Sequence, residues 1–276
     1  MLIAQISDSH IVAPGKLFRC PVQGAAADAE RVYAEFDTGP YLARAAAALN
    51  ALVPRPDIVV FTGDLVDHGE ADEYERLRDL LAPLAMPVFV IPGNHDTREP
   101  LREAFRGDGY LPAEGYLQYT VEDFPLRLVA LDTVIEGKHH GTLCAERLDW
   151  LDQALAARPD QPTVVIMHHP PFATGITYMD HYGLENAAGL ARVIARHPQV
   201  ERILCGHLHR AIDSRFAGTV AGTAPSTAHQ IRINFVPDAR LSFNFEPPGY
   251  RLHRWQDGAL ASHTAVFGDW PLPQPR

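Results

Sequence analysis

Short apolar runs alternate with stretches of helical periodicity through the first three quarters of the chain. Strands are predicted for the apolar runs, which are residues 2–6, 57–61, 87–91, 126–131, 163–167 and 200–205. Helices are predicted between them, over residues 40–52, 71–84, 145–156 and 185–196. Continuous apolar runs are typical of strands buried on both faces, and their alternation with helices predicts a layered α/β protein.

The pattern changes after Gly206, where only strands and turns are predicted. These strands cover residues 218–222, 230–236, 241–246, 250–255 and 260–266, separated by Pro, Gly and Asp. We expect them to form a second sheet that completes a β-sandwich, with residues 231–251 as hairpins that project as a cap or a subunit contact. No internal repeat, low-complexity tract or linker is evident, so a single domain over residues 1–276 is expected.

Composition narrows the class of protein. The chain has 276 residues, of which 46% are hydrophobic and 21% charged, which excludes a disordered or coiled-coil protein. Its net charge of −10 makes a nucleic-acid polymer a poor partner. No apolar run approaches the roughly 20 residues that cross a bilayer, so no membrane partner is expected. The N-terminus lacks signal-peptide features and the three cysteines are widely spaced, which predicts a cytoplasmic protein without disulfides.

The chain contains 14 histidines, more than packing alone requires. Many lie with Asp and Asn directly after a predicted strand: Asp8 and His10; Asp64; Asn94, His95 and Asp96; His168 and His169; His207 and His209. The carboxyl ends of strands in an open α/β sheet are where ligands bind. We therefore expect these five clusters to converge on one pocket.

The residue types in these clusters indicate a metal site. Carboxylate, imidazole and amide ligands suit Mn, Fe, Zn or Co, and there are too many of them for one tetrahedral ion. Two ions about 3.5–4 Å apart, bridged by a carboxylate, would use them all. Gly63, Gly93 and Gly206 permit the sharp turns that this needs. Taken singly, Asp8 or Asp64 is more simply a turn or helix-capping residue, and only the combined pattern favours metal binding.

In this order, the clusters resemble the signature motifs of the calcineurin-like metallophosphoesterases over residues 1–230. The motifs are Asp8-Ser9-His10, Gly63-Asp64, Gly93-Asn94-His95-Asp96, His168-His169 and Gly206-His207-Leu208-His209. Within that superfamily the chain is similar to the bacterial glycerophosphodiesterase and class III cyclic-nucleotide phosphodiesterase branch, through residues 6–10, 167–171 and 222–229. The resemblance implies a four-layer αββα sandwich with a β-rich C-terminal cap or hairpin region.

The resemblance also implies a role for each motif residue. One ion would be bound by Asp8, His10 and His209, the other by Asn94, His168 and His207, with Asp64 as the bridge between them. His95 would stand beside the scissile phosphate and Asp96 would orient it. Residues 18–38 depart from the shorter members of the branch and form an insertion beside the first metal-binding loop.

Three further histidines are candidate substrate contacts: His169, His181 and His229. His169 can equally be a structural histidine or support a metal ligand. His181 belongs, with Tyr178, to the loop after Pro170-Pro171, which starts at the site. His139 and His140 lie in a Gly-flanked loop and are expected to be solvated.

Together these features predict a metal-dependent phosphodiesterase. Hydroxide generated at the two ions would attack phosphorus, and His95 would assist the departing alkoxide. The acidic surface favours a small phosphodiester substrate, either a 3′,5′-cyclic nucleotide or a glycerophosphodiester.

Two alternatives remain at the level of sequence. A phosphomonoesterase or a protein Ser/Thr phosphatase has the same fold; the second would be expected to have a substrate-binding arginine, for which Arg98 is the candidate. A non-catalytic protein-binding scaffold would be expected to have lost motif residues, but every position is filled. The resemblance also implies a homo-oligomer, with Phe235, Phe243, Phe245 and Tyr250 either at the contact between subunits or in the core.

Overall fold

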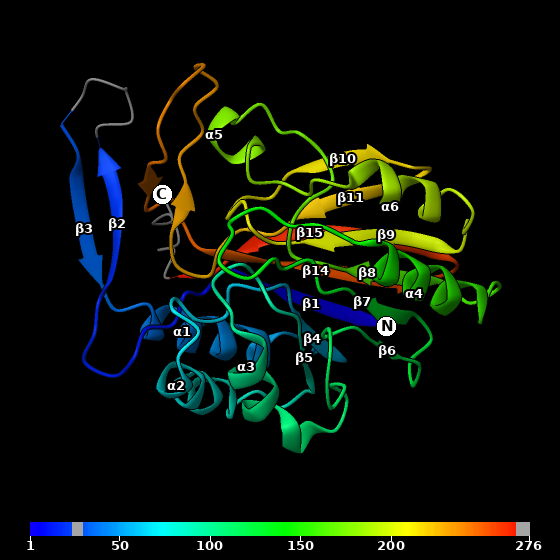
Figure 1. The fold of residues 1–276 in the computed structure, drawn as a ribbon. Coiled ribbons are helices and arrows are strands. Elements are labelled where there is room, and N and C mark those ends of the chain that lie inside the picture. Colours follow the sequence, from blue (N-terminus) through cyan, green and yellow to red (C-terminus); the bar gives the residue numbers. More distant parts are fainter. Residues whose placement is uncertain (24–29, 269–276) are drawn as a thin grey trace, which may run out of the picture.

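Two stacked β-sheets lie at the centre of the computed structural model, which describes residues 1–23 and 30–268 (Figure 1). The first sheet contains, in spatial order, β15 (Ala259–Val266), β14 (Gly249–Gln256), β1 (Leu2–Ile6), β4 (Ile58–Phe61) and β5 (Val88–Val90). The second contains β10 (Asp213–Phe216), β11 (Thr219–Thr223), β9 (Val200–Cys205), β8 (Thr163–Ile166), β7 (Arg127–Ala130) and β6 (Tyr119–Val121). The central strands of both sheets are parallel, so their carboxyl ends lie at a common edge.

Helices cover the outer face of each sheet. The first sheet packs against α1 (Gly39–Ala51), α2 (Ala71–Leu81) and α3 (Arg98–Ala104), and the second against α4 (Ala145–Ala156) and α6 (Ala187–Ile194). Side chains alternate along each strand. In β4, Val59 and Phe61 pack against the helices, while Ile58 and Val60 pack against the other sheet. The four-layer αββα sandwich is therefore confirmed, and it explains why a central strand such as β4 is apolar throughout.

The C-terminal strands do not form the second sheet by themselves, so that prediction is wrong. β14 and β15 extend the first sheet, because β1 pairs antiparallel with β14 and places Ile3 opposite His253. β10 and β11 extend the second sheet instead. The pattern of one strand does not specify its partner, since pairing depends on contacts between distant segments.

Two small β-hairpins stand at the edge where the central strands end. β2 (Phe18–Gln23) and β3 (Val32–Phe36) form one within the inserted segment, whose residues 24–29 lie outside the described residues. The predicted strands 230–236 and 241–246 shorten to β12 (Gln230–Ile231) and β13 (Phe243–Asn244), which form the other. β2 lies against β13, as Figure 1 shows. The insertion therefore packs on the segment that was expected to form a cap.

Helix α2 shows how local sequence positions a residue that supports the site. Glu70 and Glu73 form a capping box at its start, which satisfies backbone N–H groups that have no partner within the helix. Tyr74 and Leu77 are buried at helical spacing against the first sheet. The hydroxyl of Tyr74 thereby reaches the Asp96 carboxylate, 2.9 Å away.

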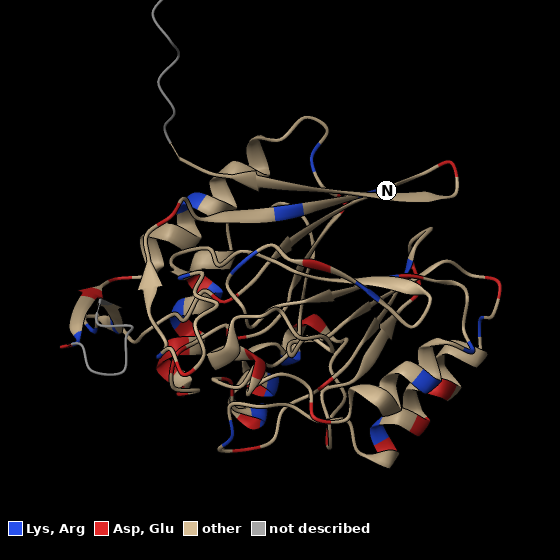
Figure 2. Ribbon diagram, turned by 90° about the horizontal axis from the view of Figure 1, so that it is seen from above, with Lys and Arg blue, Asp and Glu red and all other residues tan. Residues whose placement is uncertain are grey.

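Charged residues of both signs are distributed over the molecule. Figure 2 shows Lys and Arg interspersed with Asp and Glu along the outer helices and loops. Among the described residues, no helix is long and apolar enough to cross a membrane. The three cysteines, Cys20, Cys144 and Cys205, are free in this structure.

His253, in β14, provides a test of how pH affects stability. The side chain is fully buried; its Nε2 donates to Gln5 Oε1 at 3.0 Å, and its Nδ1 accepts from the Ser262 hydroxyl at 2.7 Å. Burial, with a smaller contribution from the positive charge of Arg251, lowers the pKa of His253 well below its usual value. The folded protein therefore holds a neutral ring that the unfolded chain protonates below about pH 6.5, so folding is weakened as pH falls.

We expect the wild type to lose about 1.4 kcal/mol more unfolding free energy than the His253→Gln variant for each pH unit below 6.5, since one proton is involved. Urea unfolding at pH 7.5 and 5.5, in a chelator so that metal loss does not contribute, measures this difference. An equal loss in both proteins would show that His253 does not cause it.

Candidate metal centre

Five of the seven predicted metal ligands have a backbone conformation that residues other than glycine rarely adopt. Their φ angles are positive: 54° at Asp8, 45° at His10, 49° at Asp64, 72° at His207 and 51° at His209. All five lie in turns that directly follow β1, β4 or β9. Such strained conformations persist only where the surrounding structure holds them, and they cluster at functional sites. The turns bring these side chains together at the common edge of the sheets.

Glycines allow these turns to approach one another closely. Gly63 has a φ of +90°, and a Cβ there would lie 2.8 Å from the backbone nitrogen of Gly93. Gly206 has no positive φ; it is needed for space, because a Cβ would overlap the Ser7 hydroxyl and the Thr62 carbonyl. Larger residues at these positions would push apart the loops that carry the ligands.

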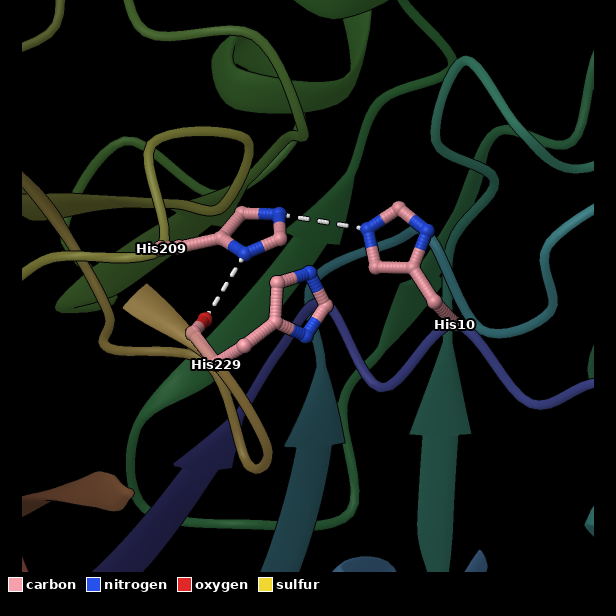
Figure 3. A group of neighbouring side chains, drawn as sticks. All are labelled: His10, His209 and His229. Atoms are coloured by element: carbon pink, nitrogen blue, oxygen red, sulfur yellow. Dashed lines mark hydrogen bonds between the residues drawn. The ribbon is translucent and has the colours of Figure 1, made fainter. Parts of the chain in front are cut away.

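The first group of candidate ligands is built around His10 and His209, whose Nε2 atoms are 3.1 Å apart (Figure 3). Their Nδ1 atoms donate hydrogen bonds, from His209 to the backbone carbonyl of His229 at 3.0 Å and from His10 to the Asp67 carboxylate at 3.2 Å. Each Nε2 therefore presents a lone pair, and the two lone pairs face each other. Carboxylate oxygens of Asp64 and Asp8 lie 3.7 Å from His10 Nε2 and 3.6 Å from His209 Nε2, respectively.

The second group has the same arrangement around His168. Its Nδ1 donates to the carbonyl of Thr62 at 2.8 Å, so Nε2 is directed at two oxygens, Asn94 Oδ1 at 3.2 Å and Asp64 Oδ2 at 3.4 Å. His207 Nε2 is buried and has no hydrogen-bond partner among the described residues. A cation between lone pairs that converge in a buried site would satisfy them all. The donor set of imidazole nitrogens and carboxylate and amide oxygens fits divalent metal ions.

The electrostatics of the protein alone already favour positive charge here. Burial lowers the pKa of His168, but Asp64 and Asp8 outweigh it and raise the pKa to about 9. Burial raises the pKa of Asp64, but the positive charges of His168 and His95 have the larger, opposite effect. The pKa of Asp64 therefore lies well below its usual value. Asp64 therefore remains ionised between the two groups.

His95 is oriented by Asp67, and the expectation that Asp96 orients it is wrong. His95 Nδ1 lies 2.8 Å from the Asp67 carbonyl oxygen and 3.3 Å from its carboxylate. In the described part of the chain, the Asp96 carboxylate accepts its hydrogen bonds from Tyr74 and from the backbone of Leu65, Val66 and Gly93. Asp96 thus joins the loops after β4 and β5. The resemblance led us to expect Asp96, which follows His95 in the sequence, because a sequence motif does not show which carboxylate is closest in space.

A cavity of about 340 Å³ opens over the metal centre. One side carries the polar residues His10, Asp64, Asp67, Asn94, His95, His139, His207 and His209. The other is largely apolar and aromatic, formed by Phe18, Pro21, Tyr178, Met179, Tyr182, Ile231, Leu241 and Phe243, with Arg19 beside them. The inserted hairpin supplies three of these residues, so it forms part of the pocket wall. A larger depression of about 860 Å³, lined by residues of α2, β5 and β6, contains none of the motif residues.

None of the three candidate substrate contacts is among the residues that line this cavity within the described chain. His181 is exposed and lines a separate depression with Pro170 and Pro171, because it follows α5 (Thr177–Asp180) on the side opposite Tyr178 and Tyr182. His229 is fully buried.

Both ring nitrogens of His169 have hydrogen-bond partners. It is fully buried, its Nε2 donates to the carbonyl of His139 at 3.1 Å, and its Nδ1 accepts from the Thr133 hydroxyl at 2.8 Å. It thereby holds the loop that carries His139. His139 is exposed, as expected, and it also lines the cavity, with its Nδ1 3.5 Å from Asn94 Nδ2.

Sequence reasoning also missed Asp67 and Arg19. Asp67 lies three residues after Asp64, and a carboxylate so close to a predicted ligand was an available signal.

Arg98, the candidate substrate-binding arginine, is held by Asp132 at 2.7 and 3.0 Å and by Glu136 at 3.0 Å, and it does not line the cavity.

Comparisons with known proteins agree with this architecture. The family description "Calcineurin-like phosphoesterase" matches residues 1–211. The probable glycerophosphodiester phosphodiesterase GpdQ of Arcobacter nitrofigilis is 35% identical, covering 100% of this chain and 96% of that protein. A probable cyclic nucleotide phosphodiesterase of Rhodopseudomonas palustris is 36% identical over 99% of this chain and 95% of that protein. The 3′,5′-cyclic adenosine monophosphate phosphodiesterase CpdA of Escherichia coli K12 is 30% identical over 81% and 80%, respectively.

Solved structures show the same fold at low identity. A dimetal phosphatase from Danio rerio superposes with a TM-score of 0.62 at 17% identity, covering 97% of this chain and 99% of that one. A purple acid phosphatase from yellow lupin superposes with a TM-score of 0.66 at 16% identity, covering 96% and 51%. Fold and site together define a metal-dependent phosphoesterase. The chain belongs to the calcineurin-like phosphoesterase family, as its motifs indicated.

Proposed function

We propose that this protein hydrolyses small phosphodiesters with the help of two metal ions. Asp8, His10 and His209 hold one ion and Asn94, His168 and His207 the other, with Asp64 between them. The observation that carries this proposal is the position of Asp64 Oδ2, 3.7 Å from His10 Nε2 and 3.4 Å from His168 Nε2. Mn, Fe, Zn and Co all suit these ligands.

Ions bound there would lower the pKa of water and offset charge on the phosphate oxygens. The residues of the chain would position the substrate and supply a proton to the leaving group. Burial lowers the pKa of His95, but Asp64 and Asp67 outweigh it and raise the pKa to about 10. With Nδ1 held by Asp67, the Nε2–H of His95 is the group that can donate to the oxygen of the leaving alcohol.

The cavity favours a small diester whose alcohol carries an apolar or planar group. Its volume of about 340 Å³ suits a nucleotide-sized molecule and excludes a folded protein segment. Phe18, Tyr178 and Phe243 offer aromatic surfaces for a base or an aryl ring. Relatives named for cyclic nucleotides and for glycerophosphodiesters both support diester hydrolysis. The aromatic wall favours the cyclic nucleotides.

The two alternatives have less support. A protein Ser/Thr phosphatase needs an arginine that faces the phosphate, whereas Arg98 is bound by Asp132 and Glu136. A non-catalytic scaffold would not require metal ligands whose lone pairs converge, nor the strained turns that hold those ligands. Phosphomonoesters fit the same metal centre and are expected as poorer substrates.

We also propose that the protein is a homo-oligomer. The four aromatic residues considered for a subunit contact divide into two pairs. Phe243 and Tyr250 are buried, whereas 64% of Phe235 and 50% of Phe245 are exposed. Ile233 and Val236, which flank Phe235 in the sequence, are also exposed, and a second copy of the chain would cover these apolar side chains.

A turnover panel tests the proposed function. Wild-type protein in Mn-supplemented buffer is assayed with 3′,5′-cyclic AMP, glycerophosphoethanolamine, an aryl phosphodiester and an aryl phosphomonoester. We expect the diesters to exceed the monoester, cyclic AMP to exceed glycerophosphoethanolamine, and a chelator to abolish all activity. Metal analysis should give about two ions per chain. A folded protein that binds no metal and turns over none of the four compounds would overturn the proposal.

A further inference from the structure

His229 is fully buried, yet both of its ring nitrogens lack a hydrogen-bond partner among the described residues. A neutral imidazole has one N–H donor and one lone pair, and leaving both unused in the interior costs free energy. His253 and His169 are equally buried, but each has partners for both nitrogens. The His229 imidazole is therefore available to bind a group from outside the polypeptide.

The polar atoms nearest to the ring belong to the first metal group. Ligand atoms of His10, His209 and His229 all lie within 4.8 Å of one another. Figure 3 shows the three rings around a common space, with His229 beside the facing nitrogens of the other two. Its other ring neighbours are Phe18, Phe243 and Phe36, with centroids 4.4, 4.9 and 5.7 Å away, and these offer no lone pair. A cation shared with His10 and His209 would satisfy the lone pair of His229.

We infer that His229 is an additional ligand of the first ion, so that three imidazoles face that ion rather than two. This inference rests on the proposed function only in requiring an ion at that place. Aromatic side chains pack around the His229 ring, and an N–H group among them can interact weakly with a ring face.

A role as a substrate contact, which the sequence suggested, fits the structure less well. His229 is absent from the residues that line the cavity, whereas Phe18, Phe243 and His209 are present there and contact its ring. Full burial is what His229 shares with Asp8 and His168, two predicted ligands that also do not line the cavity.

The backbone holds His229 as firmly as it holds the other ligands. The Ser226 hydroxyl donates to the carbonyl of Asp8 at 2.7 Å and accepts from the N–H of His229 at 3.2 Å. The carbonyl of His229 accepts from His209 Nδ1 at 3.0 Å. His229 is therefore joined to both strand-end loops that supply ligands to the first ion, which fixes its ring beside His10 and His209.

Cobalt titration of metal-free protein tests this inference. Co²⁺ is added to the wild type and to His229→Phe, which keeps a ring but removes both nitrogens, and binding is followed by visible absorption. For the variant we expect one of two binding steps to weaken at least about tenfold, as metal sites do when a supporting group is lost. The visible band of that step should change, because the number of nitrogen ligands changes. The metal-free variant should melt at a higher temperature than the metal-free wild type, since an unpartnered polar ring has been removed.

Phe36→Leu is the matched control, because Phe36 also packs on His229 but contributes no nitrogen; its ring centroid is 5.7 Å away. Its cobalt affinities should equal those of the wild type. His229→Gln supplies a second variant if His229→Phe does not fold, and it should show the same weakened step. Unchanged affinities and spectra in both His229 variants would overturn the inference while leaving the proposed function intact. A wild type that binds no cobalt would overturn both.

Discussion

Replacing Asp64 with asparagine is expected to lower phosphodiesterase kcat by at least about 10³-fold, because several kcal/mol of the metal contribution depend on this residue. Its carboxylate lies between the two groups, within 3.7 Å of His10 and 3.4 Å of His168. Asparagine has the same size but lacks the charge that holds two cations together. Metal analysis should show a fall from about two ions per chain to one or none.

The fold should survive this substitution. Asp64 Oδ1 accepts a hydrogen bond from the N–H of His95 at 2.9 Å, which the asparagine oxygen can replace. Asp72→Asn, at an exposed position in α2, is the control for removal of one negative charge, and it should keep both the metal and the activity. An Asp64→Asn protein that holds two ions and works at the wild-type rate would contradict the assignment of Asp64 as the bridge.

The strand-end motifs could be predicted from the sequence because the physics that places them is local. A buried parallel strand is apolar throughout, as in β4, and the first polar residue after it must lie at the sheet edge. Asp8, Asp64 and His207 were found in this way. The positive φ angles of these residues could not be predicted, because glycine is the residue whose presence in a sequence indicates a left-handed backbone conformation.

Contacts between distant segments were not predictable in this way. The antiparallel pairing of β1 with β14 joins residues about 250 positions apart, and nothing in either strand specifies the other. The same reason applies to Asp67, whose contact with His95 depends on how the loops after β4 and β5 cross. His139 enters the cavity because His169 holds its backbone, a contact across 30 positions.

Substituting His95 with alanine is expected to slow the hydrolysis of diesters with poor leaving groups by about 10²–10⁴-fold, the usual effect of a general acid. His95 lines the cavity, and Asp67 fixes its Nδ1, which leaves Nε2–H for the departing alkoxide. An aryl leaving group is already stable as an anion and needs less protonation. The loss with an aryl diester should therefore be at least about tenfold smaller than with an alkyl diester.

Metal content separates this role from metal binding. His95→Ala should retain the ions of the wild type, because His10, His168 and Asp64 keep their positions without it. Asp67→Asn is the companion variant. Its backbone carbonyl still accepts from His95 Nδ1, and the altered carboxylate contacts are those with His95 at 3.3 Å and with His10 Nδ1 at 3.2 Å. With the metal content shown to be unchanged, a smaller loss with the same leaving-group preference is expected. Equal losses for alkyl and aryl diesters in His95→Ala, with the metal retained, would show that His95 stabilises the phosphate rather than the leaving oxygen.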